Sequence, residues 1–166
     1  MTSDDLLVLL LELHRDKLTM RQRHVAVARH VFDYAANNTY QYVIAREDVH
    51  LQWLEAAIAE LGGVPVDVAE PAIPAPGRNQ SFTDLSEQDV ASAASFVARW
   101  RGPVDRISDV HARPRGMAKV IFGETLEQKR FFEQIVAGRD DMLGRRANGP
   151  GPSGTEGRVL PDRWME

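Results

Sequence analysis

The chain has no cysteine among its 166 residues. Disulfides, thiolate catalysis, and zinc or iron–sulfur sites built on cysteine are therefore excluded. The chain also lacks an excess of positive charge. Its formal net charge of −4 offers no general attraction to nucleic acid or to anionic lipid. The composition, 43% hydrophobic and 27% charged, is that of one ordinary globular domain.

Long apolar runs are missing as well, since none approaches the roughly 20 residues that a membrane-spanning helix needs. The stretch LLVLLLEL at residues 6–13 follows Asp4 and Asp5 rather than basic residues, and it lacks the cleavage site of a signal peptide. We therefore expect a cytoplasmic protein with neither membrane nor nucleic-acid partners. No glycine-rich phosphate loop and no nucleophile near a histidine is evident, so we expect no nucleotide or organic cofactor.

What the chain does contain is helical periodicity in four segments. The first helix is expected from Ser3 or Asp4 to about Ala36, with an inward stripe that includes Phe32. Asn37-Asn38 predicts a turn, because Asn tolerates the left-handed conformation that ends helices. A second helix should then run from about residue 39 to 61 and stop at Gly62-Gly63. A weaker alternative is one uninterrupted helix over both segments.

Residues 64–85 are rich in proline and have no helical or strand period. An extended segment of this length can carry the chain back along the whole second helix. A third helix should begin at Ser86, with Asp89 completing a capping box, and should be kinked or interrupted at Gly102-Pro103. After a turn at residues 114–116, a fourth helix is expected over about residues 117–143. The predicted fold is all-α: a four-helix bundle over residues 1–143, followed by a Gly/Pro-rich tail over residues 144–166.

Several polar residues fall on the inward faces of these helices. Glu47 and His50 lie three residues apart on the apolar stripe of the second helix. In the fourth helix, Glu124 and Gln128 are on the stripe and Glu127 is at its edge. In the first helix, His14 and Arg21 lie near the centre of the stripe and His24 at its margin.

The motifs E-D-V-H at residues 47–50 and E-T-L-E at residues 124–127 are similar to the metal-binding motifs of a known family of helical bundles. Over about residues 4–143 the chain resembles the ferritin-like superfamily, whose di-iron members carry Glu on the first and third helices and Glu-x-x-His on the second and fourth. The pattern is incomplete here. Arg21 stands near the expected carboxylate of the first helix, and Glu127 replaces the second histidine. Asp89 on the third helix is expected two or more turns from this level, so a ferroxidase centre of the usual kind is not expected.

Two hypotheses follow for the inward polar residues. In the first, an iron or manganese site handles oxygen or peroxide without ferroxidase activity, with the metal ligands Glu47, His50 and Glu124. Glu127 or His24 would complete that site, and Arg21 and Gln128 would lie around it. In the second, these residues form a hydrogen-bonded network in which Arg21 and Gln128 hold Glu47 and His50.

The second hypothesis makes the protein a metal-free ferritin-like scaffold that acts through protein–protein association. The partner would be a second copy in a homodimer or another protein. The tail offers apolar residues for such a contact, because isolated exposed side chains of this kind gain by burial. These are Val159, Leu160, Trp164 and Met165.

Overall fold

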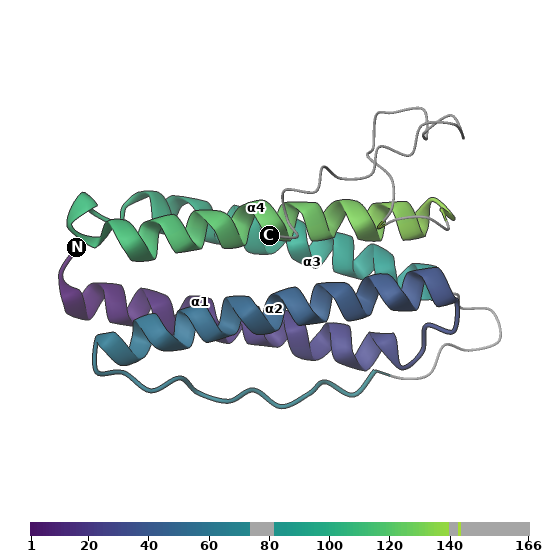
Figure 1. The fold of residues 1–166 in the computed structure, drawn as a ribbon, viewed down its shortest axis with the longest axis horizontal. Coiled ribbons are helices and arrows are strands. Elements are labelled where there is room, and N and C mark those ends of the chain that lie inside the picture. Colours follow the sequence, from purple (N-terminus) through teal and green to yellow (C-terminus); the bar gives the residue numbers. More distant parts are fainter. Residues whose placement is uncertain (74–81, 140–142, 144–166) are drawn as a thin grey trace, which may run out of the picture.

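The structure is a computed structural model that describes residues 1–73, 82–139 and 143. Four helices lie side by side (Figure 1), and they are α1 (Ser3–Ala28), α2 (Tyr34–Glu60), α3 (Phe82–Asp105) and α4 (Ala112–Val136). A short 3₁₀ helix, η1 (Asp109–His111), precedes α4. The predicted all-α, four-helix architecture is confirmed. In the part of the chain that the structure describes, no helix is both long and apolar enough to span a bilayer.

The turn between α1 and α2 comes earlier than predicted. α1 ends at Ala28, and Asp33 caps α2 by accepting a hydrogen bond from the backbone N–H of Ala36 (2.8 Å). Asn37 is inside α2, where its amide donates to the carbonyl oxygens of Ala28 (3.0 Å) and Val31 (2.9 Å). The prediction that Asn37-Asn38 forms the turn is wrong, as is the alternative of one continuous helix. Phe32, predicted to be inward, lies in the turn and is 88% exposed.

The predicted stop at Gly62-Gly63 is confirmed. Gly62 adopts a left-handed conformation (φ 78°), and the N–H of Gly63 bonds to the carbonyl oxygen of Ile58 (3.0 Å). This is a glycine-dependent way of ending a helix, because a side chain is strained at positive φ.

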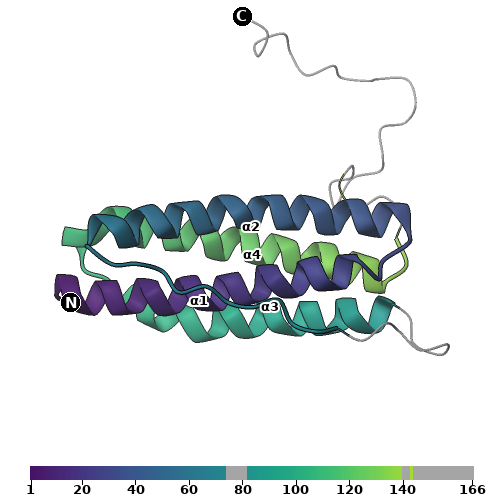
Figure 2. The ribbon, with the colours of Figure 1, turned by 90° about the horizontal axis from the view of Figure 1, so that it is seen from below.

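The segment after α2 runs the length of the bundle, as predicted. The carbonyl oxygen of Val68 accepts from Gln22 (3.2 Å), and that of Ile73 lies 3.2 Å from Nε2 of His30. The segment therefore runs in the direction of α1 and antiparallel to α2 (Figure 2). Because it returns the chain to the end where α2 begins, α2 and α3 point the same way. Residues 74–81 of the predicted crossover lie outside the described residues.

The limits of α3 and α4 differ from the predicted ones. α3 begins by Phe82, so Ser86 is a buried residue within the helix and the predicted capping box is wrong. α3 also continues through Pro103, so the predicted interruption at Gly102-Pro103 is wrong; the predicted kink stays a prediction. α4 begins five residues earlier than the predicted Met117, with Pro114 in its first turn, where a missing backbone N–H is tolerated.

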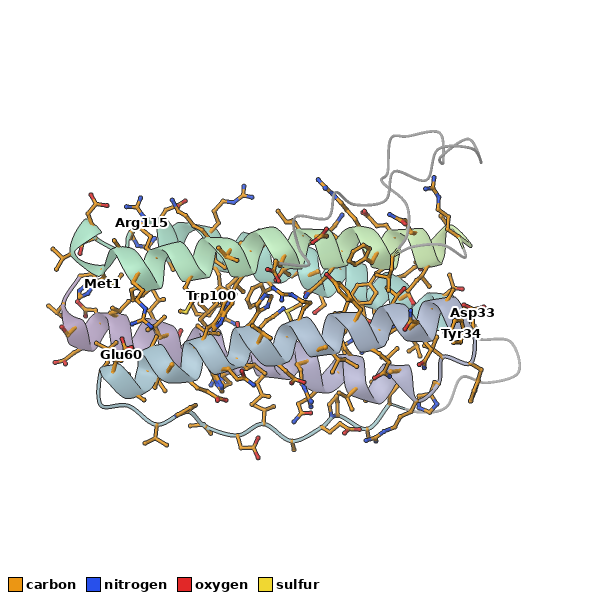
Figure 3. All side chains as sticks on the ribbon, viewed as in Figure 1. Met1, Asp33, Tyr34, Glu60, Trp100 and Arg115 are labelled. Carbon is orange, nitrogen blue, oxygen red and sulfur yellow. The ribbon has the colours of Figure 1, made fainter. Side chains whose placement is uncertain are left out.

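The C-terminal limit of α4 also differs. The helix ends at Val136, and Gly138 follows in a left-handed conformation (φ 69°), so the predicted extension to Leu143 is wrong. The predicted tail, residues 144–166, lies outside the described residues. Figure 3 shows Asp33 and Tyr34 at one end of the bundle, and Met1, Glu60 and Arg115 toward the other.

The core consists of two apolar clusters with a polar layer between them. One cluster contains residues 6–20 of α1 and 54–58 of α2, and the other contains residues 27–28 of α1 and 36–43 of α2. α3 contributes residues 93–104 to the first cluster and 82–90 to the second, and α4 contributes residues 117–122 to the first and 131–135 to the second. Every helix also contributes buried polar side chains to the interior, and together they form this polar layer. These are Lys17, His24, Glu47, His50, Ser86, Asp89, Thr125 and Gln128.

Candidate functional site

At the centre of the polar layer is a lysine that has no exposed surface. The Lys17 ammonium donates to Glu47 Oε1 (2.8 Å) and, on α4, to Thr125 Oγ1 and Gln128 Oε1 (3.3 Å each). An ammonium has three N–H donors, so its hydrogen-bonding capacity is used in full. It also lies 5.5 Å from the centre of the Phe96 ring. A buried charge is tolerated when it is paired and hydrogen-bonded in this way.

Glu47 is the acceptor that joins α1 to α2. Its Oε1 accepts a hydrogen bond from the Lys17 ammonium, and its Oε2 lies 2.8 Å from Nδ1 of His24. Because a carboxylate can only accept, the proton of this second hydrogen bond is on Nδ1. Burial raises the pKa of Glu47, but the nearby charges of His24 and Lys17 and their hydrogen bonds outweigh it and lower the pKa to about 2. Glu47 is therefore a fixed negative charge at every physiological pH.

Asp89 of α3 forms the far end of the layer. Its Oδ1 accepts from Nε of Arg23 (2.6 Å), and its Oδ2 accepts from the Tyr40 hydroxyl (2.6 Å). His24 Nε2 lies 3.8 Å from Asp89 Oδ1, which is too long for a hydrogen bond. Burial and the charge of Asp89 raise the pKa of Tyr40 well above its ordinary value, so this hydroxyl remains a donor.

His50 and Glu124 form a second group at the α2/α4 side. His50 Nε2 lies 2.8 Å from Glu124 Oε2, while Arg46 holds both oxygens of the same carboxylate at 2.5 and 2.9 Å. Burial and the charge of Lys17 lower the pKa of His50 to about 4, although Glu124 opposes this. Burial raises the pKa of Glu124, but Arg46 and His50 outweigh it and the net shift is downward. At neutral pH, His50 is thus a neutral donor to a carboxylate.

The structure brings together some of the predicted residues and separates others. Glu47 bonds directly to His24 and is joined to Gln128 through Lys17, and His50 is joined to Glu124. Arg21, expected to pair with Glu47, instead donates to Asp48 (2.9 Å) at the half-exposed edge of the bundle. That expectation is wrong. Glu127 is exposed and is not part of the buried polar layer.

Sequence reasoning missed Lys17 and misplaced Asp89. Lys17 continues the spacing of three and four residues that links buried Leu10, Leu13, Met20 and His24, so its inward direction was visible in the pattern. Asp89 was expected two or more turns from the other polar residues. Its carboxylate instead lies 3.8 Å from the ring of His24, the same ring that bonds to Glu47.

The residues present do not fit an iron or manganese centre. Both oxygens of Glu47 and both of Glu124 already accept from cationic or imidazole donors. Buried nitrogens without a partner, His24 Nε2 and His50 Nδ1, are available as ligands. Nevertheless, in residues 1–73, 82–139 and 143 no three His, Asp or Glu side chains are grouped so that they could hold an ion. Such metals need several converging donors.

Comparisons with models of protein families, with curated proteins and with solved structures gave no match.

Proposed function

We propose that this chain is a metal-independent helical scaffold that acts by binding another protein, and that Lys17 supplies the positive charge at its centre. The observation that carries the proposal is the Lys17 ammonium, which is fully buried and bonded to three acceptors on two other helices. A cation is already present where a metal would have to lie. The ferritin-like resemblance then describes the shape of the bundle rather than its chemistry.

The closure of the polar layer supports a structural role for it. Lys17, His24, Glu47 and Asp89 each have no exposed surface, so a substrate cannot reach them without opening the bundle. These residues come from α1, α2 and α3, and α4 joins them through Thr125 and Gln128, which accept from Lys17. Buried polar groups of this kind restrict helices to one register, because any slip leaves a charge unpaired.

Large apolar side chains on the outer surface support association. Tyr42, Trp53 and Val120 are 42%, 38% and 47% exposed on two neighbouring helices. Apolar residues gathered on one face of a helical bundle are typical of protein-binding surfaces. The apolar residues of the tail, which were predicted to provide the contact, lie outside the described residues.

The iron- or manganese-binding hypothesis requires a rearrangement. Lys17 would have to leave Glu47, and Arg46 would have to leave Glu124, before either carboxylate had a free oxygen for an ion. Each departure breaks a buried or half-buried ion pair, and breaking a buried one costs about 3–5 kcal/mol. The geometry therefore favours the metal-free alternative.

Elemental analysis of protein from iron- and manganese-supplemented cultures tests the proposal. We expect substoichiometric metal and a melting temperature that a chelator leaves unchanged. Lys17→Met removes the buried cation, and Lys119→Met removes an exposed lysine as the matched control. We expect that neither variant acquires a metal ion during purification. Stoichiometric iron or manganese in the wild type, with a melting temperature that falls on chelation, would refute the proposal.

A further inference from the structure

The outer surface where α2 and α4 lie side by side carries several exposed apolar side chains. Tyr42 packs edge-on against Phe131 with ring centres 5.9 Å apart, and Trp53 lies farther along α2. Val120 is exposed on α4 between these levels. We call this surface, defined by Tyr42, Trp53, Met117, Val120 and Phe131, the α2/α4 face. In Figure 1, α2 and α4 lie toward the viewer, in front of α1 and α3, and the segment after α2 runs along another side of the bundle.

The α2/α4 face is hollowed beside Trp53. A cleft of about 360 Å³ is lined there by Trp53, Ala56, Ala57, Pro114 and Met117, with Glu60 and Arg113 at its rim. Small alanines next to a tryptophan and a methionine leave room for a side chain from outside. A half-exposed tryptophan in such a setting is the type of residue that contributes most to binding energy at protein interfaces.

Two ion pairs cross the face on either side of Trp53. Arg46 pairs with Glu124, and Glu60 pairs with Arg113 (2.8 Å). On α2, Arg46 and Glu60 are each seven residues from Trp53, which is about 10 Å along a helix. On α4, Arg113 and Glu124 bracket Met117 and Val120. The face thus carries opposite charges at matched distances from an apolar centre.

This arrangement is self-complementary. If two copies meet face to face with α2 antiparallel to α2 and a two-fold axis at Trp53, Arg46 lies opposite Glu60 of the second copy. By the same rotation, Glu124 lies opposite Arg113 of the second copy. If the axis instead runs along the helices, α2 meets α4 of the second copy, and Arg46 lies opposite Glu124. Like charges do not meet in either arrangement, as a two-fold interface requires.

From these observations we infer that the α2/α4 face is the contact between two copies of this chain, with Trp53 at its centre. The inference rests on the proposed function and names the partner: a second copy. It differs from the sequence-based expectation, which assigned the contact to the tail.

Sedimentation of the full chain over a range of concentrations tests the inference. We expect the wild type to be a dimer, and Trp53→Glu and Val120→Glu to raise the dissociation constant by about 30-fold or more. The controls are Leu126→Glu on the α3 side of α4 and Val8→Glu on α1, which replace residues of similar exposure (37% and 57%). Both controls should remain dimers. Circular dichroism checks that every variant keeps its helix content.

A wild type that is monomeric at every concentration, or folded Trp53→Glu and Val120→Glu variants that dimerise as the wild type does, would overturn the inference. So would dissociation caused by Trp164→Glu in the tail but not by Trp53→Glu. Metal content measured on the same samples separates the two proposals. A dimer that contains metal would refute metal independence but not the inferred contact. A metal-free monomer would refute the inferred contact but not metal independence.

Discussion

Lys17 Nζ lies 2.8 Å from Glu47 Oε1, and neither side chain exposes any surface. The pair joins α1 to α2 halfway along the bundle, and Lys17 continues to α4 through Thr125 and Gln128. Because these bonds connect three of the four helices, their loss should affect the packing of the whole bundle.

Lys17→Met retains an unbranched apolar chain but leaves Glu47 without its ammonium partner. We expect the free energy of unfolding to fall by about 3–5 kcal/mol, measured by denaturant titration. Lys119→Met at the surface should change it by less than about 0.5 kcal/mol. Adding Glu47→Gln to Lys17→Met should recover part of the loss, since the buried carboxylate is then neutral; a double variant less stable than Lys17→Met would contradict the pairing.

Arg21→Ala distinguishes the observed network from the one predicted by periodicity. Arg21 pairs with Asp48, and the two side chains are 27% and 45% exposed. Exposed ion pairs contribute little, so the free energy of unfolding should fall by less than about 1 kcal/mol. A loss as large as that of Lys17→Met would contradict the assignment of Arg21 to an exposed pair with Asp48.

His50 should make stability depend on pH in mildly acidic solution. Its pKa is lowered from 6.5 to about 4 in the folded chain, so between these values the unfolded chain binds more protons. Stability is then fully present above pH 6.5 and is lost as the pH falls toward 4, by at most about 3 kcal/mol. His50→Gln should flatten this slope in denaturant titrations at several pH values. Equal slopes for the wild type and a folded His50→Gln variant would refute the assignment.

Tyr40→Phe removes one of the two hydrogen-bond donors to the buried carboxylate of Asp89. We expect a loss of about 1–3 kcal/mol, because a buried acceptor loses its partner. Tyr42→Phe is the matched control, since Tyr42 is 42% exposed, and its melting temperature should stay near that of the wild type. Equal melting temperatures for the two variants would show that the Tyr40 hydroxyl contributes nothing.

Asn37→Ala tests how α1 ends. The Asn37 amide donates to two carbonyl oxygens at the end of α1 and in the turn after it, and its removal should cost about 1–2 kcal/mol. The neighbouring Asn38 is exposed, so Asn38→Ala should have little effect in the same thermal melts. If the two alanine variants melt together, the capping role is wrong.

Much of the fold could be predicted from local chemistry. Helical spacing indicated four helices, Gly62 marked the end of α2 by its freedom at positive φ, and the proline-rich segment implied a crossover long enough to make α2 and α3 parallel. The limits of the helices were less predictable, because more than one residue near a helix end can cap it. Asp33 and Asn38 both suit a helix start, and the choice depended on Asn37 reaching back to the carbonyl oxygens of α1.

The sequence by itself therefore determined the class of fold, the order of its helices and which faces turn inward, since these follow from periodicity and backbone preference within each segment. Only the tertiary structure decided the partners within the polar layer. Arg21 lies on α1 between Lys17 and His24, which both bond to Glu47, yet Arg21 is 27% exposed and pairs with Asp48 at the edge of the bundle. A helical wheel places Arg21 only about 40° from Lys17, so the packing of α1 against α2 decided which of these neighbouring side chains enters the interior.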